Sequence, residues 1–174
     1  MKELIISSIY FILPAYIANM SPVLAAKLHL PFDVPINKKH LGDHKTWRGV
    51  YSAYICALAS LALQWYLQKT GTFSAYNLLD YEKINLFLYA FLFGVGAITG
   101  DTVKSFFKRK LGRSPGSSWF PFDQLDFIAG ALLFLLPFFI VSWQTALVLI
   151  IATPLLHFLA NLFAYLLRFK KVWW

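Results

Sequence analysis

Five long apolar runs constrain what this chain can fold into more than any other feature of its sequence. They cover approximately residues 4–24, 50–67, 84–107, 125–141 and 145–167. A bilayer core is about 30 Å thick, so a helix needs about 20 largely apolar residues to cross it. Only 14% of the residues are charged, against about 25% in a soluble domain, so a water-soluble fold would leave these runs exposed. The sequence therefore predicts an all-α integral membrane protein with about five transmembrane helices, in a single domain over residues 1–174.

The basic residues gather on one side of the predicted membrane. With five spans, the loops 25–49 and 108–124 and the C-terminal tail face the same way. Thirteen of the 16 Lys and Arg residues belong to this side: Lys27, Lys38, Lys39, Lys45, Arg48, Lys104, Lys108, Arg109, Lys110, Arg113, Arg168, Lys170 and Lys171. Because cytoplasmic loops carry an excess of Lys and Arg, we expect both loops to be cytoplasmic and functional. The protein would then lie in the cell membrane with its N-terminus outside and its C-terminus in the cytoplasm. Anionic lipid headgroups and phosphates explain the net charge of +8, and we expect no nucleic-acid partner.

The first of these loops contains a short segment rich in groups that bind phosphate. Residues 41–49 read Leu-Gly-Asp-His-Lys-Thr-Trp-Arg-Gly, with Lys45, Thr46 and Arg48 as donors and two flexible glycines. Lysine and arginine donate to phosphate oxygens, and glycine lets the backbone come close. The segment is therefore a candidate phosphate-binding loop. The simpler interpretation is a basic loop that only meets lipid headgroups.

The C-terminal end of the third run places charged residues on one helix face. In a helix, Asp101, Lys104, Ser105 and Lys108 follow the spacing i, i+3, i+4 and i+7, and Arg109 comes next. A carboxylate this far into a span is costly unless it is paired or solvated. One interpretation is an ion pair of Asp101 with Lys104 or Lys108 that only stabilises the fold. The other is a metal-binding carboxylate beside cations that bind phosphate.

Two further carboxylates, Asp123 and Asp126, enter the fourth run three residues apart. The spacing puts both on one face at the start of a helix, where one of them could serve as a cap. A cap does not explain the second carboxylate, which lies at the edge of the hydrocarbon. A divalent cation would neutralise both, and Mg²⁺ typically takes one or two carboxylates together with phosphate oxygens and waters. The pair is therefore a candidate Mg²⁺ site.

Several small or polar residues interrupt the apolar runs. Asn19, His157 and Asn161 could each do no more than hydrogen-bond a neighbouring helix. Asn19 lies in the proline-bracketed stretch 14–22, which could instead expose backbone carbonyls to a cavity. The G-x-x-x-G pair at 96–100 predicts close packing of the third span against another helix.

Taken together, three acids and a set of cations meet at one rim of an apolar bundle. Acids with Mg²⁺ and cations with phosphates are the recurring groups of phosphoryl and nucleotidyl transfer. The bundle itself suits a lipid tail, so the pattern predicts an enzyme that brings a nucleotide or phosphate to a lipid. The alternative is a small membrane transporter or channel, which would also explain Asp101 and His157 inside spans. It does not explain why the charges gather at one rim instead of along a path.

The order of these segments resembles the CDP-archaeol synthase family, relatives of the CDP-diacylglycerol synthases. The matching segments are 14–19, 42–49, 100–109 and 123–127, followed by His157 and Asn161. Single segments are weakly specific, whereas the ordered set extends over nearly the whole chain. One departure is His44, at a position where a glycine often precedes the lysine in the family.

The resemblance implies a CTP:lipid-phosphate cytidylyltransferase that depends on Mg²⁺ and works among membrane lipids. Its partners would be CTP and an anionic lipid phosphate, unsaturated archaetidic acid, and its products CDP-archaeol and pyrophosphate. It implies that Asp101, Asp123 and Asp126 hold the metal, and we assign catalysis to these acids and Lys104. We predict nucleotide and phosphate contacts for Lys45, Thr46, Arg48, Ser105, Lys108, Arg109 and Asn19.

Overall fold

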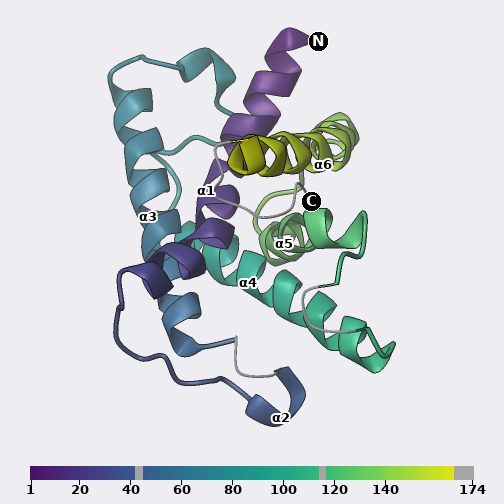
Figure 1. Cartoon of the computed structure of the whole chain (residues 1–174). Helices are drawn as coiled ribbons and strands as arrows, with labels where there is room; N and C mark the ends of the chain where they lie inside the picture. The colour runs from purple at the N-terminus through teal and green to yellow at the C-terminus, as the bar shows by residue number, and fades with distance from the viewer. Residues whose placement is uncertain (42–44, 114–116, 167–174) are drawn as a thin grey trace.

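The computed structural model describes residues 1–41, 45–113 and 117–166, and its elements in this part of the chain are helices (Figure 1). They are α1 (Lys2–Lys27), α2 (Lys38–Leu41), α3 (Trp47–Lys69), the 3₁₀ turn η1 (Ser74–Tyr76), α4 (Leu86–Lys110), α5 (Phe122–Leu135) and α6 (Trp143–Leu166). The five long helices confirm the predicted all-α class. Among the described residues, α1, α3 and α4 are long and apolar enough to cross a membrane.

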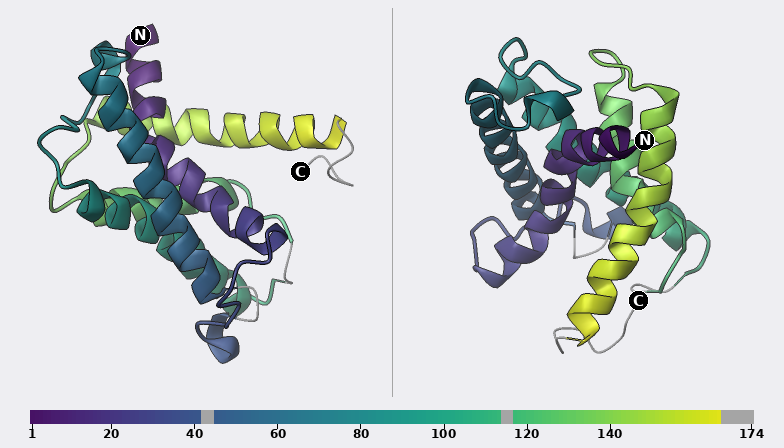
Figure 2. Two further views of the ribbon diagram at one scale, coloured as in Figure 1. Left: turned by 90° about the vertical axis from the view of Figure 1, so that its left-hand side faces the viewer. Right: turned by 90° about the horizontal axis from the view of Figure 1, so that it is seen from above.

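Prolines shape α1, and a side chain of α3 replaces a hydrogen bond that one of them removes. Pro14 and Pro22 lie inside the helix, and α1 changes direction along this stretch (Figure 2). Because proline has no N–H, the carbonyl of Tyr10, four residues before Pro14, loses its helical donor. Gln64 donates its Nε2 to this oxygen at 2.5 Å from a fully buried position. The kinked helix is therefore fastened to α3.

The core lies where α1, α3 and α4 meet. The buried rings of Phe11 and Phe93 pack edge to face, with centroids 5.5 Å apart. Gly94 lets α4 approach α3 closely, because a Cβ at this position would lie 2.8 Å from the carbonyl oxygen of Ala53. Backbone contact of this kind is typical of helices packed in membranes.

The shortest of the five long helices is α5. Its 14 residues extend about 21 Å, less than the thickness of a bilayer core. We expected the fourth run to be helical over 125–141, but the helix ends at Leu135. Pro137 follows in a turn, because it has no N–H to donate to the carbonyl oxygen of Leu133 and so cannot continue the helix. α6 then runs crosswise to α1, and the C-terminal half of α6 projects beyond the other helices (Figure 2).

Three glycines bring α4 and α5 into backbone contact. Gly96 and Gly100 of α4 face Gly130 of α5, as the G-x-x-x-G pair predicts. A Cβ on Gly130 would lie only 2.7 Å from the backbone nitrogen of Gly100 and 2.8 Å from its Cα. The crossing holds the turn of α4 that begins at Gly100 close to the first turns of α5, because Gly100 lies against the backbone of Asp126 and Gly130. These turns carry the acids that the sequence singled out.

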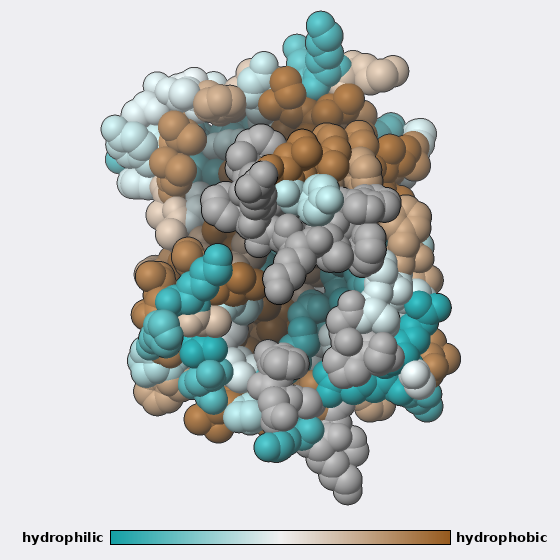
Figure 3. All heavy atoms as spheres, in the orientation of Figure 1, coloured by the Kyte–Doolittle hydropathy of each residue, from teal (hydrophilic) through white to brown (hydrophobic). Residues whose placement is uncertain are grey.

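The segments around the two basic loops lie at the same end of the molecule. In Figure 1, α2 and the C-terminal end of α4 occupy the lower part, whereas the N-terminus and the connection from α3 to α4 lie in the upper part. Figure 3 shows many hydrophilic side chains over the lower part of this face and apolar side chains over much of the middle and upper right, with a further hydrophilic group at the top. Most of the charged residues thus lie at one end of an apolar bundle.

Candidate functional site

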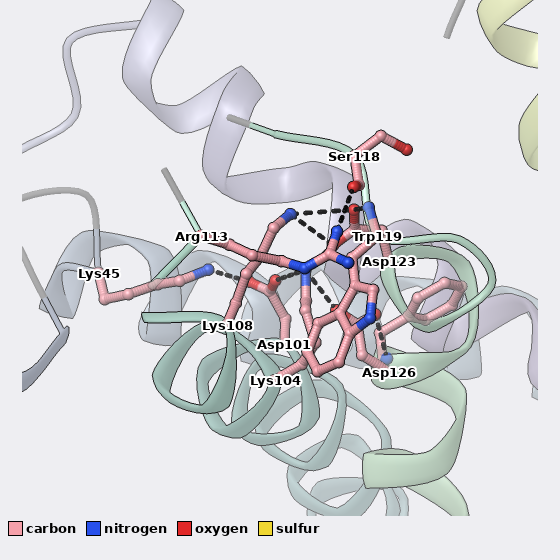
Figure 4. Close-up of polar contacts among 10 residues, drawn as sticks. Lys45, Asp101, Lys104, Lys108, Arg113, Ser118, Trp119, Asp123 and Asp126 are labelled. Carbon is pink, nitrogen blue, oxygen red and sulfur yellow. Dashed lines mark hydrogen bonds and ion pairs between the residues drawn. The ribbon is translucent and has the colours of Figure 1, made fainter. Parts of the chain in front are cut away.

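The three acids predicted from the sequence converge on one lysine (Figure 4). The Nζ atom of Lys104 lies 3.3 Å from Asp101, 2.8 Å from Asp123 and 2.9 Å from Asp126, measured to the nearest carboxylate oxygen. Only 16% of the Lys104 side chain and 5% of the Asp126 side chain are exposed. A single ammonium group therefore contacts carboxylates from two helices in a largely buried place.

Helix geometry explains this convergence. Asp101 and Lys104 are three residues apart on α4, and Asp123 and Asp126 are three apart on α5, so each pair shares one face of its helix. A Cβ on Gly100 would meet the carbonyl oxygen of Asp126, which shows how closely the two helices approach there. The first turn of α5 is thereby held against the charged face of α4. The ion pair of Asp101 with Lys104, expected as the simpler interpretation of this stretch, is present.

Two more lysines complete the charge balance of the cluster. Lys45, which precedes α3, forms an ion pair with Asp101. Lys108 contacts both carboxylate oxygens of Asp123, at 3.1 and 3.0 Å. Three acids thus face three lysines, and in Figure 4 Lys45 reaches Asp101 from the side opposite Asp126. We call these six residues the acid–lysine cluster.

The hydrogen bonds that Asp123 accepts lower its pKa by more than burial raises it. Burial raises the pKa of this carboxyl, but Lys104, Lys108 and the backbone N–H of Trp119 all donate to it, and its pKa lies below the ordinary value. The Trp119 nitrogen is 2.6 Å from Oδ2, and Arg113 in turn donates to the carbonyl oxygen of Ser118 at 3.1 Å. The segment before α5 is therefore tied to the cluster and keeps Asp123 ionised.

Two predicted phosphate contacts have other partners in this structure. Thr46 is the N-cap of α3, where its hydroxyl accepts from the backbone nitrogen of Gly49 at 3.4 Å. Arg48 pairs with Asp33 at 2.9 Å and donates to the carbonyl oxygen of Leu30 at 3.4 Å. The structure thus brings Lys45 into the cluster and turns Arg48 toward the loop after α1.

The remaining predicted contacts are not members of the cluster. Ser105 is half-buried on α4, whereas Arg109 is exposed in the last turn. Asn19 is half-buried on α1, three residues after Tyr16. The ring of Tyr16 packs against that of Phe127, which follows Asp126, with centroids 5.3 Å apart.

Parts of the predicted site lie outside the described residues. They are Gly42, Asp43 and His44 of the first loop, residues 114–116 of the second, the side chain of Asn161, and the basic residues Arg168, Lys170 and Lys171.

Sequence reasoning missed several partners of the cluster. The pair of Lys45 with Asp101 joins residues 56 positions apart, and no local spacing signals such a contact. The Trp119 nitrogen is a backbone donor, which leaves no trace in the residue types. Outside the cluster, Asp33 is one of two acids in the basic loop 25–49, and local spacing does not signal its pair with Arg48.

The donor set suits a divalent cation that is shared with phosphate. Among the described residues, no three His, Cys, Asp or Glu side chains are grouped to hold a metal ion by themselves. Asp123 and Asp126 nevertheless both contact the Lys104 ammonium. Their carboxylate oxygens are therefore close enough to share one cation. Mg²⁺ needs only one or two carboxylates when phosphate oxygens and waters complete its octahedron. The hard oxygen donors of the cluster meet this requirement.

Comparison with known proteins gives consistent matches over the full length. The profile of a family described as CarS-like, CDP-archaeol synthase, matches residues 1–174. The chain is 33% identical to the CDP-archaeol synthase of Methanococcus aeolicus over 98% of this chain and 97% of that protein. It is 39% identical to that of Thermococcus gammatolerans over 96% of this chain and 95% of that protein.

A solved structure also resembles the fold. It is described as an intramembrane enzyme for archaeal membrane lipids biosynthesis, with a TM-score of 0.67 and 29% sequence identity. The likeness covers 88% of this chain and 91% of that one. The arrangement of the helices is thus shared with an enzyme that works inside a membrane.

Proposed function

The chain belongs to the CDP-archaeol synthase family and is a membrane cytidylyltransferase, and we propose that it moves CMP from CTP to unsaturated archaetidic acid through its acid–lysine cluster. The observation that supports this use of the cluster is the convergence of Asp101, Asp123 and Asp126 on Lys104 at one end of an apolar bundle. Nucleotidyl transfer needs such a place, where phosphates, a metal and a lipid headgroup can meet.

The proposed reaction is an in-line displacement at phosphorus. An oxygen of the lipid phosphate attacks the α-phosphorus of CTP, and the bond from this phosphorus to the bridging oxygen of the β-phosphate breaks. CDP-archaeol and pyrophosphate are formed. Because the lipid phosphate is already ionised near neutral pH, the attack needs no general base. The demand on the protein is therefore electrostatic, since two polyanions must be brought into contact.

The lysines of the cluster meet this demand. Lys45 and Lys108 each pair with an acid at the edge of the cluster, while Lys104 lies between all three. We assign the outer phosphates of CTP to Lys45 and Lys108, and the developing charge at the reacting phosphates to Lys104. Thr46, Arg48, Ser105, Arg109 and Asn19 are proposed as further nucleotide contacts at the margin of the site.

Mg²⁺ is the cofactor that the donor set and the reaction favour. Asp123 and Asp126, with Asp101 beside them, would hold it together with phosphate oxygens. When bound, the ion supplies Lewis-acid stabilisation of the phosphate oxygens. The acids also orient the lysines before the substrates arrive, because every acid of the cluster is paired with at least one of them.

We place the cluster on the cytoplasmic face, as the positive-inside rule favours. The N-terminus then lies outside and the C-terminus inside, and the five long helices form one membrane domain over 1–174. CTP reaches the site from the cytoplasm and the lipid phosphate from the bilayer. The transporter alternative is not favoured, because most of the charged residues lie at one end of the bundle and three acids of that end converge on Lys104.

A labelled-product assay with matched variants tests this proposal. Purified protein is mixed with CTP labelled at the α-phosphorus, Mg²⁺ and unsaturated archaetidic acid, and labelled lipid is measured. We expect Asp123→Asn and Asp126→Asn to lower the rate by about 10²–10³, the cost of a preorganised electrostatic contact. Asp80→Asn is the control, because Asp80 pairs with Lys83 in the loop at the opposite end. Wild-type rates in both cluster variants would refute their role, and an absence of labelled lipid with wild-type protein would refute the proposed function.

A further inference from the structure

An apolar groove between α4 and α5 opens beside the acid–lysine cluster. It has a volume of about 310 Å³ and is lined by Val103, Lys104, Phe107, Trp119, Phe122, Leu125, Asp126 and Ala129. On α5 the lining residues recur at i, i+3, i+4 and i+7, so they form one continuous face of that helix. The volume is at the lower end of the range for ligand sites in proteins.

The groove has one charged end and one apolar side. Of its lining residues only Lys104 and Asp126 are charged, and both belong to the cluster. The side chains that flank its opening are apolar and half exposed, with 48% of Val103, 50% of Phe107 and 52% of Phe122 accessible. We take these side chains to face the bilayer, because apolar and aromatic residues at the ends of membrane spans lie at the lipid interface. The groove thus connects the bilayer with the reacting end of the site.

Charge separates this groove from the place assigned to the nucleotide. Lys45 and Lys108, the lysines at the edge of the cluster, pair with Asp101 and Asp123, and none of these four residues lines the groove. A triphosphate needs several cations, whereas the groove presents one. A single phosphate that carries apolar chains matches one ammonium next to an apolar channel.

On the basis of the proposed function, we infer that the groove between α4 and α5 is the lateral entry and tail site of the lipid-phosphate substrate. The phosphate lies at Lys104, and the first part of one isoprenoid chain lies along Val103, Phe107 and Ala129. The groove therefore contributes to selection of the lipid, while the opposite side of the cluster takes CTP. Lys104, which contacts both sides, aligns the two substrates.

A variant that fills the groove with an indole ring distinguishes an effect on lipid binding from an effect on nucleotide binding. Ala129 is an exposed residue of α5 that lines the groove, so Ala129→Trp adds bulk there without entering the helix core. We expect the KM for a geranylgeranyl ether phosphate in mixed micelles to rise by about tenfold or more, the usual effect of spoiling an apolar subsite. The KM for CTP should stay within about twofold of the wild-type value. Activity toward a short-chain, water-soluble lipid phosphate should also stay near wild type.

Ala59→Trp is the matched control. Ala59 is likewise exposed on a long apolar helix, α3, but does not line the groove. We expect this variant to keep the wild-type KM for both substrates. An unchanged lipid KM in Ala129→Trp, or an equal rise in Ala59→Trp, would overturn the groove assignment.

A second measurement decides the question even if Ala129→Trp fails to fold. A lipid phosphate with a photoreactive diazirine in one chain is cross-linked to wild-type protein in micelles, and the labelled peptides are identified. We expect labels in the peptides that contain Val103, Phe107 and Ala129, and competition by unlabelled lipid phosphate. Labelling confined to α3 or α6 would refute the tail site. If wild-type protein makes no CDP-lipid at all, the proposed function fails, whereas an active wild type with unlabelled α4 and α5 refutes only the groove.

Discussion

Replacing Lys104 with methionine tests whether one ammonium holds the cluster together. The substitution keeps an unbranched side chain of similar length and removes three ion pairs, to Asp101, Asp123 and Asp126. Asp101 keeps Lys45 as a partner and Asp123 keeps Lys108. Asp126, with 5% of its side chain exposed, is left without an ion pair among the described residues.

The expected loss of stability follows from the one carboxylate, that of Asp126, which loses its ion pair. Breaking a buried ion pair by removing one partner costs about 3–5 kcal/mol. Because Lys104 itself is 16% exposed, we expect the lower end, a loss of about 3 kcal/mol in the free energy of unfolding. By the scaling of globular domains of this size, this loss lowers the Tm by about 6–12 °C.

A double-mutant cycle in detergent isolates the cause. Lys104→Met, Asp126→Asn and the double variant are unfolded by heat or denaturant, and Lys110→Met, an exposed lysine in the last turn of α4, is the control. The double variant should recover about 2 kcal/mol relative to Lys104→Met, because the stranded carboxylate is gone. A Lys104→Met protein as stable as wild type, or a double variant that recovers nothing, would show that this reasoning is wrong.

Three further predictions follow from other parts of the structure. Gln64→Leu removes the donor to the Tyr10 carbonyl, which proline has deprived of its helical partner, and should lower the free energy of unfolding by about 1–3 kcal/mol in denaturant titrations. Gly130→Ala places a Cβ against the backbone of Gly100 and should destabilise by about 1–3 kcal/mol in the same assay, whereas Gly49→Ala, whose Cβ would meet its nearest neighbour at 3.5 Å, should be tolerated. Chelation of divalent cations with EDTA should abolish label transfer from CTP, and added Mg²⁺ should restore it; full activity in EDTA would contradict the assigned metal.

The sequence contained most of the information about the fold, because membrane insertion and helix periodicity are local properties. Apolar runs of about 20 residues predict helices wherever they occur. The G-x-x-x-G pair likewise predicted close packing of α4 against another helix, which the structure shows to be α5. The end of α5 at Leu135 was harder to place, because apolarity continues past Pro137 while helical geometry does not.

The candidate site was predictable in its residue types but not in its pairings. The i, i+3 spacing placed Asp101 with Lys104 and Asp123 with Asp126 on common faces, and the structure shows both faces turned to each other. Which distant lysine reaches which acid depends on how the loops fold back. Lys45, which precedes α3, turns to Asp101, whereas Arg48, in the first turn of α3, turns to Asp33.

The fate of the individual phosphorus atoms of CTP tests the central claim most directly. Purified protein is given unsaturated archaetidic acid, Mg²⁺ and CTP labelled at either the α- or the γ-phosphorus, and lipid and pyrophosphate are separated and counted. CMP transfer predicts that the α-label appears in the lipid and the γ-label in pyrophosphate, in equal amounts. A γ-label in the lipid, or lipid that stays unlabelled by both, would contradict nucleotidyl transfer by this protein.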